Sequence, residues 1–232
     1  MGITITGLYI TFFALSIYAL FTLTTTQIIL AYILFYFLLE VVMSLFIHRW
    51  ATHNLWNPPV WFQNIMSVVS MTALIGTPIS YSAWHRTHHK TSDTTSDPHS
   101  PKHMSYLDII FGTHTHKFNV KKAGSRLRNE WQLLLTKYET PLVFMCNVIL
   151  FLALPLEMFL MWVIAVAMSK FWMVFGTGIV CHGYSKGIPT NVPYMYPLIF
   201  NDCNHKDHHE APKLQPLKFD LWVWLIKRFG WT

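Results

Sequence analysis

Residues 85–89 read HRTHH and residues 205–209 read HKDHH, and these two copies of one pattern limit how the chain can fold. A related cluster, HRWATH, occupies residues 48–53. At this histidine content HxxHH is expected roughly 0.04 times by chance. Because positions i, i+3 and i+4 share one face of a helix, each HxxHH can direct three imidazoles at one point. The repeated pattern therefore predicts a metal site built from distant segments.

The first cluster has a different spacing. His48 and His53 are five residues apart, which offsets them by about 140° on an ideal α-helix. We therefore expect them to bracket two metals instead of sharing one. A ninth candidate is His182 in VCHGY, which ends the last apolar stretch of the sequence. We expect it at the same membrane face as the three histidine clusters. The candidate metal ligands are His48, His53, His85, His88, His89, His182, His205, His208 and His209.

The number and type of these ligands indicate a dinuclear centre. Nine imidazoles exceed the four ligands of a structural zinc site, whereas two metals with four or five nitrogens each would use them all. Imidazole also suits iron. Soluble di-iron bundles use inward-facing carboxylates with Glu-x-x-His pairs, and no such pair accompanies these clusters. The pattern is therefore typical of a histidine-rich membrane site.

The composition favours a membrane protein. Of 232 residues, 53% are hydrophobic and only 12% are charged, which is too apolar for a typical soluble globule. Four stretches approach the roughly 20 residues that cross a bilayer: 3–24, 26–47, 140–156 and 157–181. The predicted fold is a single all-α integral-membrane domain with four transmembrane helices in two hairpins. Residues 48–139 and 182–232 would form a cap outside the bilayer.

The distribution of positive charge predicts the orientation. Of 17 Lys and Arg residues, ten lie between Arg49 and Lys137 and six between Lys186 and Arg228, and residues 22–27 contain none. By the positive-inside rule the cap and its metal site are cytoplasmic in a multi-pass protein. The net charge of +6 on that face suits an acidic electron-transfer protein or anionic lipid headgroups, although ordinary topological bias explains it equally well. No recognised motif supports nucleic-acid binding.

A fifth apolar stretch, residues 60–81, must not cross the membrane. If it did, His85 would lie about 30 Å from His48, and the site could not form. Gly76 and Pro78 are potential helix breakers near the end of the stretch. The interpretation is an interfacial or shallow re-entrant helix between the first two histidine clusters.

At these residues the chain resembles the membrane fatty acid desaturases, the group that contains stearoyl-CoA desaturase and acyl-lipid enzymes. They share HxxxxH, HxxHH and HxxHH in this order, and the resemblance covers roughly residues 40–212. It extends over HRTHHKTSDTTSDPHSPKH (85–103), in which an acidic turn and Asp97-Pro98-His99 follow the second cluster. One departure is Gly178, because relatives often carry at this place an Asn that holds a water near one iron.

The resemblance implies both a fold and a reaction. The fold would be two transmembrane hairpins beneath a cytoplasmic cap with an enclosed acyl tunnel. The nine histidines would hold two iron ions, and no further catalytic side chain is implied. With O2 and two electrons from an external donor such as ferredoxin or cytochrome b5, the enzyme would place a cis double bond in a fatty acyl chain. The chain could be carried by coenzyme A, by a carrier protein or by a membrane lipid.

Two alternatives stay open, one an enzyme of the same di-iron class and the other not an enzyme. A di-iron lipid hydroxylase would return oxygen to the same carbon after a small change in geometry. A histidine-lined metal transporter is disfavoured, because transporters place their sites near the bilayer midplane and these clusters are expected at one membrane face.

Several carboxylates are candidates to orient the ligands, since a metal-bound histidine usually passes its second N–H to a carboxylate or carbonyl. Simple surface exposure is an equal alternative for each. These candidates are Asp93, Asp97, Asp202, Asp207 and Glu210.

Two ionisable residues lie inside predicted spans. Glu40 and Lys170 are about 12 and 18 Å deep at 1.5 Å per residue, where such groups normally face the bundle interior and pair. We expect them to approach one another or a polar point in the tunnel, with snorkelling of Lys170 as the alternative.

Other segments are expected to be peripheral. Residues 221–231 read LWVWLIKRFGW, which predicts a membrane-surface anchor. The remaining histidines of the central loop are expected to be solvated, with headgroup binding as the alternative. They are His99, His103, His114 and His116.

Overall fold

The computed structural model describes residues 3–112, 119–124, 127–212 and 221–228. Within these ranges the chain forms helices and no sheet strand, apart from one isolated bridge between Asn191 and Asn204. The all-helical prediction is therefore confirmed for the part of the chain that the structure covers.

The first hairpin consists of α1 (Ile3–Thr22) and α2 (Thr25–Tyr36). Thr24 and Gln27 form a reciprocal cap at the start of α2 that satisfies backbone N–H groups at the turn. Beyond Tyr36 the helix continues without a break as the π-helix η1 (Phe37–Thr52). The combined helix from Thr25 to Thr52 delivers the first histidine cluster at its far end.

The second hairpin consists of α7 (Glu139–Ala153) and α8 (Leu156–Trp172), and α8 continues as the π-helix η4 (Met173–Val180). The short helix α6 (Glu130–Lys137) meets α7 at an angle of 81°. Three helices are long and apolar enough to cross a membrane, and the bent α6–α7 pair would make a fourth. These helices correspond to the four apolar stretches of the sequence.

The two hairpins pack through α8, which lies against both α1 and α2. Small side chains take part in the contact: Ala19 of α1 and Ala31 of α2 are fully buried and cluster with Leu160 and Ile164 of α8. Ala165 of α8 is also fully buried. Small residues allow the backbones of membrane helices to approach closely, because dispersion contacts replace the hydrophobic effect there.

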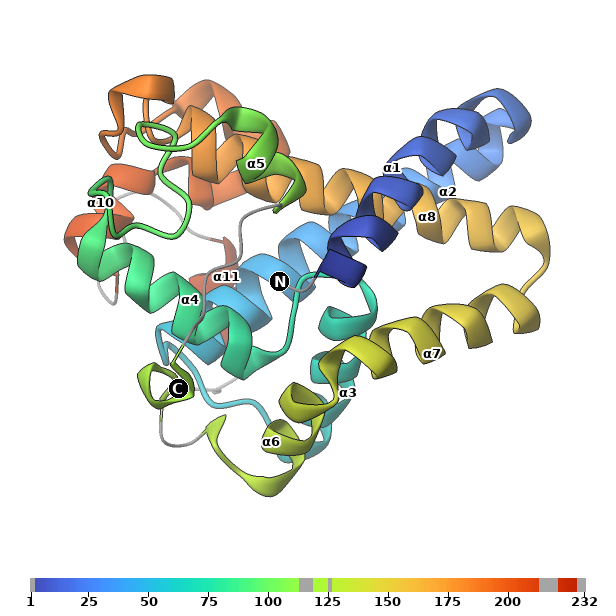
Figure 1. The fold of residues 1–232 in the computed structure, drawn as a ribbon, viewed down its shortest axis with the longest axis horizontal. Coiled ribbons are helices and arrows are strands. Elements are labelled where there is room, and N and C mark those ends of the chain that lie inside the picture. Colours follow the sequence, from blue (N-terminus) through green and yellow to red (C-terminus); the bar gives the residue numbers. More distant parts are fainter. Residues whose placement is uncertain (1–2, 113–118, 125–126, 213–220, 229–232) are drawn as a thin grey trace.

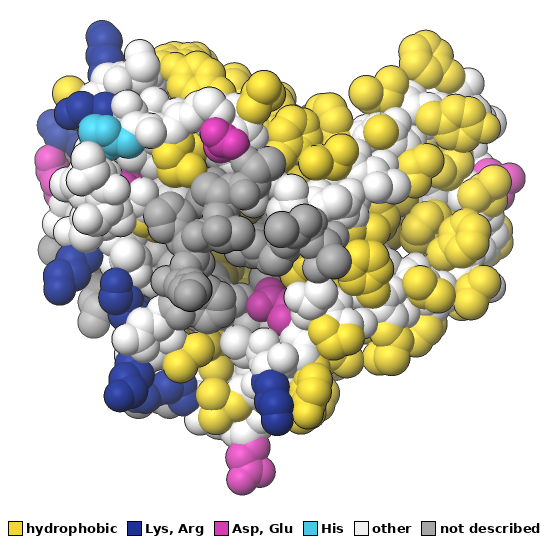
Figure 2. All heavy atoms as spheres, in the orientation of Figure 1, with side chains coloured by type: hydrophobic (Ala, Val, Ile, Leu, Met, Phe, Trp, Pro, Cys, Tyr) yellow, Lys and Arg dark blue, Asp and Glu magenta, His cyan; other side chains and the backbone are white. Residues whose placement is uncertain are grey.

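The polar and apolar parts of the molecule are separated. Both hairpin turns lie at one end, whereas α4 (Pro78–Thr91) and α10 (His205–Glu210), which carry the HxxHH clusters, lie at the other (Figure 1). Figure 2 shows hydrophobic side chains over the hairpin ends, and the Lys and Arg side chains visible on this face lie away from them. This distribution is expected of hairpins that are buried in a bilayer beneath a polar cap.

The stretch from 60 to 81 does not separate the histidine clusters. It forms α3 (Val60–Thr72), a turn in which Leu74 and Gly76 have positive φ angles, and the start of α4. Thirteen residues span about 20 Å, which is less than the roughly 30 Å of a hydrocarbon core. His85 on α4 consequently lies on the same side of the molecule as His48 on η1. The interfacial position of α3 stays a prediction.

The remaining helices are short. α11 (Leu221–Arg228) covers part of the predicted anchor: Trp222 donates a hydrogen bond to Glu40 at 3.2 Å, and Trp224 is exposed. Residues 229–231 of that segment lie outside the described residues. The other short elements are α5 (Tyr106–Phe111), η2 (Val120–Lys122), η5 (Tyr184–Lys186), η6 (Pro193–Met195), α9 (Tyr196–Ile199) and η7 (Phe200–Cys203).

Candidate metal centre

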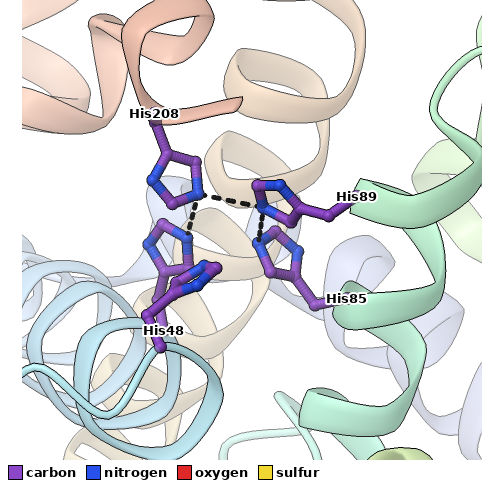
Figure 3. Close-up of side chains that lie close together, drawn as sticks. His48, His85, His89 and His208 are labelled. Atoms are coloured by element: carbon purple, nitrogen blue, oxygen red, sulfur yellow. Dashed lines mark hydrogen bonds between the residues drawn. The ribbon is translucent and has the colours of Figure 1, made fainter. Parts of the chain in front are cut away.

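Five imidazoles from three helical segments form one group. Their potential ligand atoms all lie within 4.8 Å of one another. The Nε2 atoms of His48 and His208 are 2.9 Å apart, and those of His208 and His89, and of His89 and His85, are 3.0 Å apart (Figure 3). The five-histidine group comprises His48, His53, His85, His89 and His208.

The other four candidates form a second group. The Nε2 atom of His205 lies 3.0 Å from that of His182 and 3.2 Å from that of His209, which is 3.2 Å from that of His88. The four-histidine group comprises His88, His182, His205 and His209. All nine candidates thus lie in one of two adjacent groups, each of which draws on several distant segments.

The expectation that each HxxHH directs three imidazoles at one point was wrong. His85 and His89 belong to the five-histidine group, whereas His88, between them, belongs to the other. The third cluster is divided in the same way, with His208 in one group and its two neighbours in the other. On a helix i and i+4 differ by about 40°, but i+3 and i+4 by about 100°, so i and i+4 point together and i+3 points aside.

The expectation that His48 and His53 bracket two metals was also wrong, because both lie in the five-histidine group. The segment is a π-helix, and the N–H of His53 donates to the carbonyl of His48 at 3.2 Å in the i→i+5 pattern. Five residues then complete about one turn, which brings the two side chains to the same face. The assumption of ideal α-helical geometry caused the error.

The spacing of the ring nitrogens fits two metal ions. A neutral ring nitrogen carries either one N–H or one lone pair, yet the Nε2 atom of His208 lies at contact distance from two other Nε2 atoms. At a metal–nitrogen distance of about 2.1 Å, two ligands at right angles lie about 3.0 Å apart. The buried Nε2 atom of His53 has no hydrogen-bond partner in the structure, so a bound cation would satisfy it.

Three of the five candidate carboxylates contact the outer Nδ1 atoms. Asp97 receives the His88 Nδ1–H at 2.9 Å, and Asp93 receives that of His182 at 2.8 Å. Asp202 lies 3.6 Å from Nδ1 of His48 and 3.5 Å from Arg49. The hydrogen bonds from His88 to Asp97 and from His182 to Asp93 fix the orientation of these two rings and leave their Nε2 atoms for the metal. The distance of 3.6 Å between Asp202 and His48 is too long for a hydrogen bond.

The other two candidates have partners elsewhere. Asp207 accepts a hydrogen bond from the Asn191 side chain at 2.7 Å, and its N–H donates to the Asn191 carbonyl oxygen Oδ1. Glu210 forms an exposed ion pair with Lys206 at 3.8 Å.

Burial favours the neutral form of His89 and His209, which metal binding requires. Desolvation and neighbouring histidines lower the pKa of His89 to about 3 and that of His209 to about 2. Burial raises the pKa of the Asp97 carboxyl to about 6. Burial also acts against ionisation of Asp202, but the charge of Arg49 and the contact with His48 lower the pKa of this carboxyl to about 2.

His99 is not a solvated loop residue, so that expectation was wrong. It is 7% exposed, and its ring stacks on Trp84 with the centroids 4.2 Å apart and lies 4.0 Å from the ring of His88. A Cβ atom at Gly178 would lie 3.3 Å from its Cδ2 atom. The His99 ring therefore occupies the space beside Gly178. His103 is exposed, and His114 and His116 lie outside the described residues.

A cavity of about 370 Å³ adjoins the histidines. Its lining includes His85, His88 and His205 from the two histidine groups, and also Lys170 and Glu139. Lys170 donates to the Leu74 carbonyl at 3.3 Å and experiences the charge of Glu139. Glu40 is not among the lining residues and accepts the hydrogen bond from Trp222. Its pairing with Lys170 stays a prediction.

Sequence reasoning missed Glu139. This carboxylate stands at the first position of α7, where it accepts hydrogen bonds from the Thr77 backbone at 3.2 Å and the Ser80 hydroxyl at 3.3 Å. A lone carboxylate at the start of an apolar stretch was the available signal. In the sequence alone, Glu139 cannot be distinguished from the charged residues that commonly flank apolar helices. Its role becomes visible only in the folded structure, where it accepts hydrogen bonds from Thr77 and Ser80.

Fold and site together combine helices that are long and apolar enough to span a membrane with two histidine groups that could each hold a metal ion. Over 221 residues the chain is 24% identical to delta-9 acyl-lipid desaturase 2 of Arabidopsis thaliana, covering 84% of this chain and 69% of that protein. It is 30% identical over 178 residues to acyl-CoA 5-desaturase AL21 of Anemone leveillei, covering 70% and 54%. A third relative, delta-9 desaturase-like 3 protein of Arabidopsis thaliana, is 25% identical over 180 residues, covering 70% and 58%.

The chain thus spans little more than half the length of two of these relatives. No family model matches the sequence, and no solved structure matches it. The chain is therefore similar over most of its length to acyl-lipid and acyl-CoA desaturases, and this similarity supports the membrane fatty acid desaturase family.

Proposed function

We propose that this protein is a fatty-acyl desaturase that uses O2 and two electrons from an external donor to introduce a cis double bond into a lipid chain. The observation that carries the proposal is that the cavity reaches both histidine groups, with His85 of the five-histidine group and His88 and His205 of the four-histidine group in its wall. An acyl chain in this cavity would lie against both groups.

The two groups would each hold one iron ion. The five-histidine group offers one ion five nitrogens, and the four-histidine group offers the other four. When bound, the irons supply the redox chemistry that activates O2 for removal of hydrogen from an unactivated methylene. Asp97 and Asp93 hold the rings of His88 and His182 in place, and Asp202 places a carboxylate 3.6 Å from Nδ1 of His48.

The cavity wall provides the selectivity. A methylene group has no polar atom that the protein could bind. The protein must therefore hold one segment of the acyl chain against the metal site, because a small misplacement of the reacting carbons lowers the reaction rate strongly. Ile109, Met173 and Val174 line the cavity and can pack against a hydrocarbon chain. The buried histidine end keeps bulk water away from the reacting carbons.

The electron donor would approach the polar face of the cap. We propose that this face is cytoplasmic and that four helices span the membrane. Exposed Lys102 and Lys186 flank the point at which Asp93 holds His182. A Cβ atom on Gly187, next to Lys186, would lie 2.7 Å from Cβ of Lys102 and 3.1 Å from Oδ1 of Asp93. An acidic redox protein that docks on these lysines would come close to the four-histidine group.

The test is mass spectrometry of lipids from cells that express the wild type, His88→Ala or the control His103→Ala, in which an exposed histidine is changed. We expect a new unsaturated acyl species with the wild type and with His103→Ala, and its loss with His88→Ala. A hydroxylated species that depends on His88 would instead assign a hydroxylase. Absence of any new species from a folded, iron-loaded wild type would contradict the proposal.

A further inference from the structure

The cavity has a closed end and an open end. At the histidine end His88, His205 and Gly178 are buried. At the other end Lys137 is exposed, and Thr136 and Thr140 are partly exposed. Among the described lining residues, Lys137 and Pro141 are the two that are exposed, and both lie at the junction of α6 and α7. We therefore place access from outside the protein at this junction.

That junction has the character of a membrane interface. Trp131, Leu134 and Tyr138 on and after α6 are 39%, 47% and 43% exposed. Helix α6 is fixed to α3 by a 2.7 Å hydrogen bond from the Gln132 amide to the Ser67 hydroxyl. Helix α6 is short, exposes apolar and aromatic side chains and adjoins the end of the apolar helix α7. Such a helix is expected to lie in the headgroup region of a bilayer. The cavity therefore opens at the depth of lipid ester groups.

Opposite charges line the cavity near this opening. Lys170 is 4% exposed, and its ammonium group lies 4.5 Å from the centre of the Tyr9 ring. Glu139 is held by Thr77 and Ser80, and its charge acts on Lys170. Desolvating two charges is costly, and a hydrocarbon tail placed against them would offer no polar contact in return. This part of the cavity suits the polar end of a ligand.

An apolar stretch separates the polar end from the histidines. Along α8 and η4 the cavity is lined by Lys170, Met173, Val174, Thr177 and Gly178. Gly178 is eight positions after Lys170, which corresponds to about 12 Å at the α-helical rise of 1.5 Å per residue. A ligand with its polar end near Lys170 would thus run a hydrocarbon segment past Met173 and Val174 to the metal groups.

We propose that the substrate is an ester-linked glycerolipid of the membrane, which enters from the bilayer at the α6–α7 junction and places its ester groups beside Lys170 and Glu139. This assignment of the acyl carrier rests on the proposed desaturase function. Acyl-CoA fits less well, because coenzyme A carries several phosphates. Among the described lining residues the formally charged Lys, Arg, Asp and Glu side chains are Lys137, Lys170 and Glu139, which leave only one net positive charge.

The experiment measures binding without turnover. Purified protein is incubated with a phosphatidylcholine that carries a photoreactive diazirine in one acyl chain, and the crosslinked residues are mapped by mass spectrometry. We expect labelling of residues 170–178, displaced by unlabelled dipalmitoyl phosphatidylcholine at a concentration at least tenfold lower than that of stearoyl-CoA. Equal or stronger displacement by stearoyl-CoA, or labelling only outside the cavity, would overturn the proposal.

Charge removal provides a second readout. The double variant Lys170→Met/Glu139→Gln removes both charges together, and we expect it to lower cavity labelling about tenfold. The same substitutions at an exposed ion pair, Lys206→Met/Glu210→Gln, serve as the matched control and should leave labelling unchanged. A folded Lys170→Met/Glu139→Gln protein that labels like the wild type would contradict the assignment.

The two proposals fail separately. Cavity binding of phosphatidylcholine without formation of a double bond would remove the desaturase function and leave the lipid site. Desaturation of stearoyl-CoA without phosphatidylcholine binding would do the reverse.

Discussion

The Nε2 atoms of His48 and His208 lie 2.9 Å apart although 160 positions separate the two residues in the sequence. One stands on the helix of the first hairpin and the other on α10 of the cap. Their contact forms only if the cap folds back onto the end of that hairpin. Because both Nε2 atoms face the centre of the five-histidine group, this contact is best explained by a shared cation.

The carboxylate of Asp97 should strengthen metal binding by the four-histidine group. In Asp97→Asn the acceptor of the His88 Nδ1–H is weakened and the ring loses its fixed orientation. We expect metal affinity to fall about 10–100-fold, measured by titrating the metal-loaded protein with a chelator. Glu210→Gln, at an exposed carboxylate, is the control. Equal affinity in Asp97→Asn and the wild type would remove Asp97 from this role.

Acid should destabilise the metal-free protein. The pKa of His89 is lowered to about 3 and that of His209 to about 2, whereas an unfolded histidine titrates near 6.5. Below about pH 6.5 the unfolded chain therefore binds protons that the folded chain does not, and stability falls by up to about 1.4 kcal/mol per pH unit for each such histidine.

Thermal unfolding in detergent at pH 7.5, 6.0 and 5.0 measures this effect. We expect the melting temperature of the metal-free protein to fall over this range, starting below the unfolded pKa. A melting temperature that rises towards pH 5 would mean that the imidazoles are charged in the folded protein.

Close packing of α8 against the first hairpin should not tolerate larger side chains. Ala165→Leu adds volume at a fully buried position, and overpacking costs about 1–3 kcal/mol. Ala153→Leu, the same change at an exposed position near the end of α7, should have little effect. The melting temperatures of both variants in one detergent give the comparison, and an unchanged Ala165→Leu protein would contradict the packing.

The sequence was sufficient to identify the nine histidines and the helical hairpins. Long apolar stretches and closely spaced histidines are local patterns, and the requirement that His48 and His85 meet on one side added the constraint on residues 60–81. The structure brings all nine imidazoles together in two groups, as a centre with two metal ions requires.

Other features depend on geometry that no local pattern encodes. The π-helical winding of η1 places His48 and His53 in one group, and ideal α-helical spacing could not indicate it. The burial of His99 depends on Gly178 and Trp84, which lie on two other helices. The presence of Glu139 and Lys170 in one cavity likewise depends on how α7 and α8 pack against the segment that leads into α4.

The most direct measurement of the central claim is the iron content of the purified, folded protein. We expect two irons per chain in the wild type and one in each of two double variants, His48→Ala/His208→Ala and His182→Ala/His205→Ala, which remove ligands from different groups. Spectroscopy should report loss of a coupled pair in both variants. A saturated wild type with one iron or none, or double variants that retain two, would contradict a dinuclear centre held by these nine histidines.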